Sequence, residues 1–348
     1  MFSKKTAKIK DLEIGGSSPL RIQTMWDRRV FPEDIPSVVE KLKRLRVLGL
    51  DIVRFSVLDE NDVEVLSEIQ SRIDIPLVAD IHFDYKLALS ALDHKIPKVR
   101  INPGNIGPEW KSREIYKKAS DTGAAVRIGL NSGSLPLKFK GMKKADAMVE
   151  SATEYIDIAE KTGFDNLVIS LKSSDLDETV KANEKLASLV DYPIHLGVTE
   201  AGGVVESAVR STWALGNLLK NGIGDTIRVS ITGSLEDEVV AGMEIARALG
   251  LLNGGIRIVS CPRCGRHVFD TDAMLREVKE NITLFPKKDM TIAIMGCQVN
   301  GPGEAESADY AVTGIGNSVF LYKRGKLYEK IERKNALSEL LKVIEDDR

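Results

Sequence analysis

The fold of this chain is decided by residues 97–131, which read PKVRINPGNIGPEWKSREIYKKASDTGAAVRIGLN. Two short runs rich in β-branched residues, Val99–Asn102 and Ala125–Asn131, enclose an amphipathic stretch at Glu109–Thr122. Such runs separated by a helical pattern are typical of a strand–helix–strand unit. Strands joined by a helical crossover run parallel, so this segment predicts a parallel sheet covered by helices.

The same alternation extends in both directions, from about residue 20 to about residue 250. Eight strands are predicted, at Arg21–Met25, Ile52–Val57, Leu77–His82, Val99–Asn102, Ala125–Asn131, Leu167–Lys172, Ile194–Thr199 and Ile227–Thr232. The other helical stretches include Ser37–Leu48, Ala152–Thr162, Thr179–Leu189, Val204–Lys220 and Glu236–Gly250. Eight such units in roughly 250 residues are typical of a TIM (β/α)8 barrel, an α/β fold. A doubly wound open sheet is disfavoured because no G-x-G-x-x-G turn follows the first strand.

The pattern changes after a joint at residues 251–255. The elements predicted beyond it are a helix at Asp270–Asn281, a strand at Thr291–Met295, a Gly/Pro loop at Gly296–Gly303, a hairpin of Val319–Tyr322 and Leu327–Ile331 turning at Arg324–Gly325, and a helix from Ala336. We therefore predict a barrel domain over residues 1–252 and a smaller α+β domain over residues 253–348.

Composition excludes several classes of protein. The formal net charge of −2 over 348 residues gives no electrostatic reason to expect nucleic acid or an anionic membrane as partner. No apolar run approaches the roughly 20 residues that span a bilayer, and no apolar core that would indicate a signal peptide follows the first lysines. Three cysteines clustered between residues 261 and 297 are a poor disulfide framework. We expect a cytoplasmic protein whose cysteines bind metal.

Four arginines occupy equivalent places in the predicted strands: Arg54 in Val-Arg-Phe-Ser, Arg100 in Val-Arg-Ile-Asn, Arg127 in Val-Arg-Ile-Gly and Arg228 in Ile-Arg-Val-Ser. The active site of a (β/α)8 barrel lies at the C-terminal ends of its strands. If all four point inward, too few carboxylates are present to pair them, and an anionic ligand is the natural partner. Guanidinium groups suit phosphate oxygens. The alternative is that some point outward and pair with helix carboxylates.

Further polar residues stand at the predicted strand ends: Asp80, His82, Asn102, Asn131, Ser170, Lys172, Thr199, Glu200 and Ser230. Glu200 can serve as a general acid among the arginines, or it only orients Arg228 or Lys172. His82 either contacts substrate or caps a strand. His195 receives no role from the sequence.

The cysteines form a C-x-x-C turn, Cys261-Pro-Arg-Cys264, with Cys297 in a loop that reads Met-Gly-Cys-Gln-Val-Asn-Gly-Pro-Gly-Glu. The turn alone fits a redox dithiol, half a zinc site or part of an iron–sulfur site. The glycine-rich loop favours a cluster, because it presents backbone N–H groups to sulfur. Glu304, seven residues after Cys297, is the candidate for an exchangeable fourth ligand. Zinc remains the alternative, since Cys261, Cys264, His267 and Cys297 would complete a Cys3His site.

Four motifs together resemble one family. They are Cys-Pro-Arg-Cys-Gly-Arg at 261–266, Met-Gly-Cys-Gln-Val-Asn-Gly-Pro-Gly-Glu-Ala at 295–305, Gly-Val-Thr-Glu-Ala-Gly at 197–202 and Gly-Asp-Thr-Ile-Arg-Val-Ser at 224–230. They resemble the 4-hydroxy-3-methylbut-2-enyl diphosphate synthases of the two-domain bacterial type. The resemblance spans nearly the whole chain and implies a TIM barrel followed by a [4Fe–4S] domain.

The resemblance also implies an activity. The family, an oxidoreductase, opens 2-C-methyl-D-erythritol 2,4-cyclodiphosphate reductively and eliminates water, giving (E)-4-hydroxy-3-methylbut-2-enyl diphosphate in the non-mevalonate isoprenoid pathway. Electrons come from flavodoxin or ferredoxin. The family's cluster ligands fall on Cys261, Cys264, Cys297 and Glu304, and its acid–base carboxylate falls on Glu200. Its substrate contacts fall on Arg54, Arg100, Arg127, Asn131, Lys172, Arg228 and Ser230, beside which we place Asp80, His82 and Asn102 in the predicted site.

Chain geometry predicts a homodimer with a shared active site. The helix Glu236–Gly250 runs roughly 22 Å away from the barrel mouth at 1.5 Å per residue. The joint at residues 251–256 reaches back at most about 20 Å and must also travel inward to the barrel axis. We expect that the cluster domain of one chain closes the barrel of its partner, as the resemblance also implies.

Two rival functions remain open at this point. A zinc-dependent barrel hydrolase would be colourless and stable in air. A nucleic-acid module with a zinc ribbon would need a basic small domain, and the acidic residues Asp270, Asp272, Glu277 and Glu280 argue against it.

Overall fold

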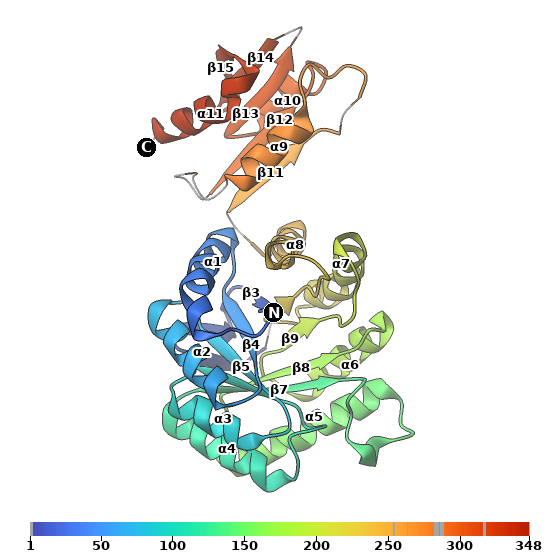
Figure 1. Ribbon diagram of the computed structural model, residues 1–348. Coiled ribbons are helices and arrows are strands. Elements are labelled where there is room, and N and C mark those ends of the chain that lie inside the picture. The colour runs from blue at the N-terminus through green and yellow to red at the C-terminus, as the bar shows by residue number, and fades with distance from the viewer. Residues whose placement is uncertain are drawn as a thin grey trace. The chain divides into compact units, whose positions relative to one another are not determined.

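The N-terminal part of the chain forms a barrel of eight parallel strands enclosed by helices (Figure 1). The structure is a computed structural model that describes residues 3–252, 255–262, 264–281, 285, 289–315 and 318–347. The chain divides into two compact units, Met1–Leu252 and Asn253–Arg348.

Strands and helices alternate regularly in the first unit. Their bounds are β3 (Arg21–Met25), α1 (Ile35–Leu48), β4 (Ile52–Val57), α2 (Glu60–Arg72), β5 (Leu77–Ile81), α3 (Tyr85–Asp93), β6 (Lys98–Ile101), α4 (Glu109–Thr122), β7 (Ala125–Asn131), α5 (Lys144–Lys161), β8 (Leu167–Lys172), α6 (Leu176–Leu189), β9 (His195–Gly197), α7 (Val204–Lys220), β10 (Thr226–Arg228) and α8 (Leu235–Ala248). Aspartate or serine caps begin several of the helices, as Asp59 does for α2 and Ser234 for α8.

Strand pairing closes the sheet into a barrel. The ladder runs β8-β7-β6-β5-β4-β3-β10-β9, and a parallel bridge between Ile169 and Ile194 joins its two ends. The backbone N–H of Ile169 donates to the carbonyl of Pro193 at 2.8 Å at this seam. The predicted (β/α)8 barrel is confirmed, and the doubly wound alternative is wrong because its sheet would have free edges.

A short hairpin closes the N-terminal end of the barrel. It consists of β1 (Thr6–Ile9) and β2 (Leu12–Gly15). Its apolar side chains pack against the first inward-facing residues of four barrel strands, in a buried cluster of Ala7, Ile9, Ile14, Ile52, Val78, Ala125 and Val168. This hairpin was not predicted from the sequence. Apolar side chains thus fill the N-terminal end of the barrel. The polar inward-facing side chains lie at its C-terminal end.

Four predicted strands end earlier than expected. Leu77–His82 and Val99–Asn102 extend one residue too far, since β5 stops at Ile81 and β6 at Ile101. Ile194–Thr199 and Ile227–Thr232 were too long, since β9 stops at Gly197 and β10 at Arg228. Their polar continuations leave the ladder for loop contacts: the N–H of Thr232 donates to the carbonyl of Gly202 at 2.9 Å. Helices α4 and α7 and strands β4, β7 and β8 have the predicted bounds.

The second unit is a five-stranded mixed sheet with helices on both faces. Its elements are β11 (Ile256–Ser260), α9 (Thr271–Glu280), β12 (Met290–Met295), α10 (Gly301–Glu306), β13 (Tyr310–Ile315), β14 (Ser318–Lys323), β15 (Lys326–Ile331) and α11 (Ala336–Glu345). Strands β11, β12 and β13 are parallel, and β14 and β15 are antiparallel. Met274 of α9 and Leu340 of α11 pack with Ile292 and Val312 in one core, whereas Ala305 of α10 packs with Ala293 and Ala311 in another.

Some details of this unit differ from the prediction. The hairpin around Arg324–Gly325 is confirmed, and both turn residues have positive φ, as a two-residue hairpin turn of the primed type requires. The loop predicted over Gly296–Gly303 is wrong in its second half, where α10 begins at Gly301. Strands β11 and β13 were not predicted, because β13 is buried on both faces and shows no alternation.

Candidate active site

Asp80 on β5 is the centre of a buried charge cluster at the C-terminal end of the barrel. Its Oδ1 accepts a hydrogen bond from Nη1 of Arg100 at 2.9 Å, and its Oδ2 lies 3.5 Å from Nε of Arg54. Burial alone would raise the pKa of Asp80, but the charges of Arg54 and Arg100 outweigh it and hold that pKa well below its ordinary value. One ionised carboxylate is thus shared by two arginines.

Arg127 on β7 is a buried cation with free donors. It is 1% exposed, and its Nε and Nη1 have no hydrogen-bond partner among the described residues. Burial, followed by repulsion from Arg54 and Arg100, lowers the pKa of Arg127 well below its ordinary value. Burial likewise lowers the pKa of Arg54 to about 10. Unpaired guanidinium donors in a barrel are costly, and an anion would satisfy them.

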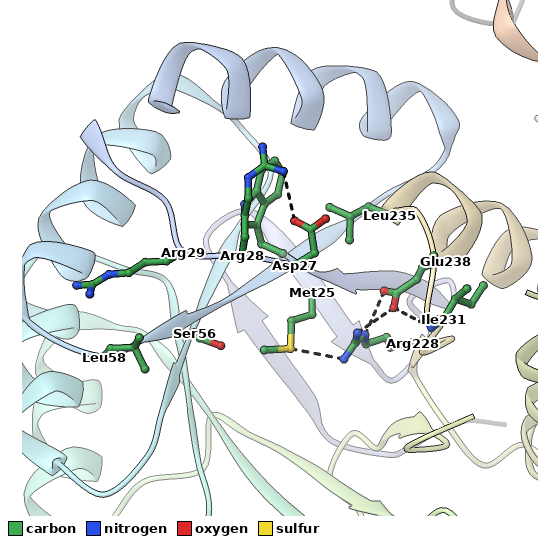
Figure 2. A pocket seen from close by; sticks show the side chains of 12 residues that line it. Met25, Asp27, Arg28, Arg29, Ser56, Leu58, Arg228, Ile231, Leu235 and Glu238 are labelled. Carbon is green, nitrogen blue, oxygen red and sulfur yellow. Dashed lines mark hydrogen bonds and ion pairs between the residues drawn. The ribbon is translucent and has the colours of Figure 1, made fainter. Parts of the chain in front are cut away.

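Arg228 on β10 is held by a helix carboxylate. Its Nη2 donates to Oε1 of Glu238 at 2.8 Å and its Nε to Oε2 at 3.2 Å. Figure 2 shows this pair beside Met25, in the wall of a cavity of about 450 Å³ that Ser56 also lines. The alternative that an arginine pairs with a helix carboxylate therefore applies to Arg228, although the pair lies at the mouth and not on the outer surface.

Lys172 at the end of β8 is the fifth cation. It is 5% exposed, and its Nζ lies 2.9 Å from Nε2 of His195. Burial, followed by repulsion from Arg127 and other arginines, lowers the pKa of Lys172 well below its ordinary value. Among the described residues, the carboxylates that face these five cations are those of Asp80 and Glu238; the cations are Arg54, Arg100, Arg127, Lys172 and Arg228.

Two glycines make room for these long side chains. A Cβ on Gly129 would lie 2.4 Å from Nε of Arg100, and a Cβ on Gly197 would lie 2.7 Å from Nζ of Lys172. The carbonyl of Gly129 also accepts a hydrogen bond from Nη2 of Arg100 at 2.9 Å. Because Gly129 and Gly197 have no side chain, they leave the space that Arg100 and Lys172 occupy.

His82 and Asn102 support the loops around Arg100. Nε2 of His82 lies 2.7 Å from Nη1 of Arg100. Because an arginine can only donate, the histidine accepts there and orients the guanidinium. Asn102 is fully buried, donates to Oγ of Ser134 at 2.9 Å and accepts from the N–H of Gly104 at 2.9 Å. Its amide thus joins two loops of the mouth.

The remaining predicted barrel residues stand at strand ends. Asn131 closes β7 and Ser230 follows β10, and both are half-buried. Glu200 is exposed in the loop after β9 and has a φ of +49°. A left-handed backbone is uncommon outside glycine and tends to occur at functional sites.

Sequence reasoning missed several buried polar residues of the barrel. Glu238 lies on the apolar face of α8 with Leu235 and Val239, and a charge on that face was the signal that could have found it. Lys98 is fully buried with no partner for Nζ in the described part of the chain. Its spacing from Arg100, two residues along β6, places both on the inner face. Gln23 is also buried without hydrogen bonds among the described residues.

The three thiols of the second unit lie on two loops at the ends of β11 and β12. Cys261 and Cys297 are half-buried, Cys264 is exposed, and all three are free. The N–H of Gly296 donates to Sγ of Cys261 at 3.1 Å. Hydrogen bonds from the N–H groups of Val299 and Asn300 lower the pKa of Cys297. Backbone donors aimed at sulfur favour thiolates and fit an iron–sulfur cluster.

A zinc tetrahedron is not already formed at this site. Among the residues that the structure describes, no three His, Cys, Asp or Glu side chains are close enough to hold one metal ion. Nδ1 of His267 lies 2.6 Å from the carbonyl of Cys264, so Nε2 is the ring nitrogen that is left for a metal. The half-buried Cys261 also contacts the apolar cluster under α10.

Glu304 lies on α10, exposed to solvent. The N–H of Gly301 donates to the carbonyl of Cys297, and the N–H of Glu304 to that of Asn300, each at 3.0 Å. Both bonds span four residues, and the first joins the loop that carries Cys297 to the start of α10 at Gly301. Glu304 thus lies in the first turn of the helix that directly follows the Cys297 loop.

Two family models match the chain: the GcpE TIM-barrel domain over residues 4–243 and the GcpE protein C-terminal domain over residues 257–346. The chain belongs to the GcpE family. The resemblance drawn from the four motifs is thereby confirmed, and the GcpE barrel model covers every cationic strand position described above.

Curated relatives of this GcpE chain carry one name. It is 45% identical to 4-hydroxy-3-methylbut-2-en-1-yl diphosphate synthase (flavodoxin) of Treponema denticola, over 95% of this chain and 92% of the relative. The proteins of the same name from Caldanaerobacter subterraneus and Clostridium tetani are 44% and 43% identical, covering 97% and 99% of this chain and 95% and 100% of the relatives.

Solved structures share the barrel fold at low identity. Dihydropteroate synthase of Yersinia pestis superposes with a TM-score of 0.52 at 12% identity, over 71% of this chain and 98% of that one. Type I 3-dehydroquinate dehydratase of Clostridium difficile gives 0.51 at 18% identity, over 71% and 97%. These likenesses show the fold alone. In the described part of this GcpE chain, no helix combines the length and apolar character needed to cross a bilayer.

Proposed function

We propose that this chain converts 2-C-methyl-D-erythritol 2,4-cyclodiphosphate into (E)-4-hydroxy-3-methylbut-2-enyl diphosphate, as a GcpE-family oxidoreductase of the non-mevalonate isoprenoid pathway. One carbon–oxygen bond of the ring breaks and leaves the open diphosphate. A second carbon–oxygen bond breaks as the hydroxyl takes up a proton and leaves as water. Two electrons enter, and a carbon–carbon double bond forms.

The observation that carries this proposal is the excess of cations in the barrel mouth. In the described part of the chain, two carboxylates face five cations, which are Arg54, Arg100, Arg127, Lys172 and Arg228. A cyclic diphosphate carries the missing negative charge, and its oxygens suit guanidinium donors. Asn131, at the end of β7, and Ser230, just after β10, bind its hydroxyl or phosphate oxygens in this proposal. Asp80, His82 and Asn102 keep the arginines and loops in place.

Glu200 is the group that we assign to the departing hydroxyl. It stands exposed in the loop after β9, on the same side of the barrel as the cations. A carboxylic acid placed there donates the proton that converts the leaving hydroxide into water. Its left-handed backbone conformation, with φ of +49°, supports a role that outweighs local strain.

The second unit holds the redox group in this proposal. Cys261, Cys264 and Cys297 are the thiolate ligands and Glu304 the exchangeable fourth ligand of a [4Fe–4S] cluster. When bound, the cluster supplies electrons singly, delivered by reduced flavodoxin, the donor named for the relatives, or by ferredoxin. The N–H groups around Cys261 and Cys297 stabilise thiolate charge and hold both sulfurs.

We further propose a cytoplasmic homodimer in which the cluster domain of one chain closes the barrel of its partner. The reach of the joint at residues 251–256 supports this arrangement. Free thiols that must bind iron also fit a reducing compartment better than an oxidising one.

Anaerobic purification tests the function directly. The protein should be brown, contain close to four irons per chain, and release the open diphosphate from the cyclic substrate when reduced flavodoxin is added. Glu304→Ala should keep iron and lose turnover. A colourless protein with stoichiometric zinc would contradict the proposal and favour a zinc hydrolase.

Complementation tests the shared site. Glu200→Gln removes the barrel contribution and Cys297→Ser the cluster contribution, so each homodimer should be inactive. Purified heterodimers of the two variants should regain activity at one of their two sites. An inactive heterodimer would show that each site is assembled within one chain.

A further inference from the structure

Lys172 is a flexible cation held among other cations. Its pKa is lowered first by burial and then by Arg127, Arg54, Arg228 and Arg100, which repel an ammonium group. In the part of the chain that the structure describes, no carboxylate lies within ion-pair distance of Nζ. A lysine has four rotatable bonds in its side chain and loses considerable entropy when it is fixed. Some other group must therefore keep Nζ in the mouth.

His195 is the group that contacts it. Nζ of Lys172 lies 2.9 Å from Nε2 of His195, whose Nδ1 lies 2.6 Å from Oγ1 of Thr226. His195 and Thr226 are both fully buried and are register partners on β9 and β10. The imidazole therefore connects the lysine to the Thr226 side chain on the neighbouring strand β10.

The charge of Lys172 sets the direction of these hydrogen bonds. An ammonium group, the form of Lys172 that would bind an anion, can only donate, so in that form Nε2 of His195 accepts from Lys172. The ring proton then sits on Nδ1 and donates to Oγ1 of Thr226. Burial, followed by the charge of Lys172, lowers the pKa of His195 well below its ordinary value, and a neutral ring is the form that can accept.

Gly197 leaves room for the side chain of Lys172 beside β9. A Cβ on Gly197 would lie 2.7 Å from Nζ and 3.1 Å from Cε of Lys172. The aliphatic part of the Lys172 side chain thus crosses β9 at Gly197. Gly197 lies two residues after His195 and therefore on the same face of the strand. The contact with Nε2 of His195 and the space beside Gly197 together favour one position for Nζ of Lys172.

We infer that His195 is a positioning residue, which holds Lys172 through one hydrogen bond and leaves the other two N–H donors of Nζ for the anionic substrate. The inference rests on the proposed function, because it takes Lys172 as a substrate contact. It assigns to His195 and Thr226 a role that neither the sequence motifs nor the relatives' name supplies.

Two amide substitutions separate this role from simple packing. A glutamine at 195 extends about as far as Nε2 and can accept from Lys172, whereas an asparagine reaches only as far as Nδ1 and can bond Thr226 alone. His195→Gln should bind the cyclic diphosphate within about threefold of the unchanged protein. His195→Asn should bind it about tenfold more weakly or worse, equivalent to about 1.4 kcal/mol. Calorimetry on oxidised holoenzyme measures this without turnover.

A double-substitution cycle tests whether the effect passes through Lys172. In a Lys172→Met background, His195→Asn should cause no further loss of affinity, because the group that it positions is absent. In steady-state assays His195→Asn should raise KM more than it lowers kcat, as expected for a contact made alike in the ground and transition states. Unfolding midpoints and iron content verify that every variant is folded and loaded.

Two results would overturn the inference. One is an equal affinity of the His195→Gln and His195→Asn variants for the cyclic diphosphate, whether lowered or unchanged. The other is a loss of affinity from His195→Asn that persists in the Lys172→Met background. Inorganic diphosphate separates this question from the proposed function. If the unchanged protein binds inorganic diphosphate but not the cyclic diphosphate, the proposed substrate is wrong, while the same His195–Lys172 coupling measured with inorganic diphosphate still supports the positioning role. Binding of neither anion would contradict both.

Discussion

The barrel mouth and the cysteine loops are built on opposite principles. In the mouth, Arg100, Arg127 and Lys172 are each 5% exposed or less and stand on strands of a closed sheet. In the second unit, Cys264 is exposed and Cys261 and Cys297 are half-buried on loops. The first site is buried and carries excess positive charge. In the second, backbone N–H groups point at sulfur.

The difference shows where each site obtains its geometry. The barrel fixes its cations before any ligand arrives, at the cost of burying charges that repel one another. The cysteine loops fix little by themselves, because thiolates are brought together by the metal that they bind. Substitutions in the mouth should therefore change the affinity for the cyclic diphosphate and the stability of the barrel separately, or in opposite directions. Substitutions at the thiols should change how well the metal is retained.

The largest effect should come from Cys297→Ser. Loss of one thiolate should remove most of the cluster and abolish turnover, while the barrel keeps its fold and its affinity for the cyclic diphosphate. All three tryptophans, Trp26, Trp110 and Trp213, lie in the barrel unit, so tryptophan fluorescence follows the unfolding of the barrel alone. Ser307→Ala, in the second unit like Cys297, serves as control. A barrel that unfolds at a lower temperature in Cys297→Ser would show that the two sites are not independent.

Asp80→Asn should destabilise the barrel by about 3–5 kcal/mol at neutral pH, because it leaves two buried arginines without their carboxylate. The pKa of Asp80 is depressed in the folded state, so its stabilising effect is present above the unfolded pKa of about 3.9 and is lost as the pH falls through and below that value. Urea unfolding, followed by tryptophan fluorescence between neutral and acid pH, measures both effects.

The Asp80→Asn variant should accordingly show a flatter decline of stability in acid than the unchanged protein. Asp146→Asn is the matched control, since Asp146 is paired with Lys185 at 2.7 Å on the surface, where such pairs contribute little. Equal acid slopes with and without Asp80 would mean that the arginines do not depress its pKa.

Arg127→Met should weaken binding of the cyclic diphosphate by about 3 kcal/mol, roughly a hundredfold. It should leave the ligand-free barrel at least as stable as before, because the substitution removes a buried cation with unsatisfied donors. Arg113→Met on the surface of α4 is the control, because the partner of Arg113 among the described residues is Glu109 of the same helix. Calorimetry and thermal unfolding give the two quantities. Arg127→Met that loses stability together with affinity would mean that its charge is compensated within the barrel.

The smallest effect should come from Gly296→Ala. The added Cβ would lie 3.0 Å from Cγ2 of Thr271 and 3.5 Å from Sγ of Cys261, so the cysteine loop must shift slightly. We expect a cost of about 1 kcal/mol and a few-fold faster loss of iron to a chelator, monitored by visible absorbance. Gly265→Ala is the control, because its Cβ would meet no atom within 4 Å. Identical rates for both variants would show that the loop is free to adapt.

The local pattern of apolar and polar residues determined much of the fold. The β-branched runs and amphipathic stretches fixed the eight strand–helix units, because the hydrophobic period of each segment selects strand or helix before any tertiary contact forms. Arg54, Arg100 and Arg127 could be placed on one face of their strands by alternation alone. The spacing of Cys261, Cys264 and Cys297 and the four motifs then pointed to the GcpE family.

Tertiary structure decided what pairs with what. Glu238 comes from a helix and reaches Arg228 on a strand, and His195 reaches Lys172 across strands 23 residues apart. No local period contains such contacts, because they depend on the closure of the sheet and on side-chain length. The hairpin of β1 and β2, which seals the barrel with Ile9 and Ile14, likewise acquires its role only when eight strand ends form a ring for it to cover. The sequence thus determined which groups are present, and the closed barrel determined which of them share charge.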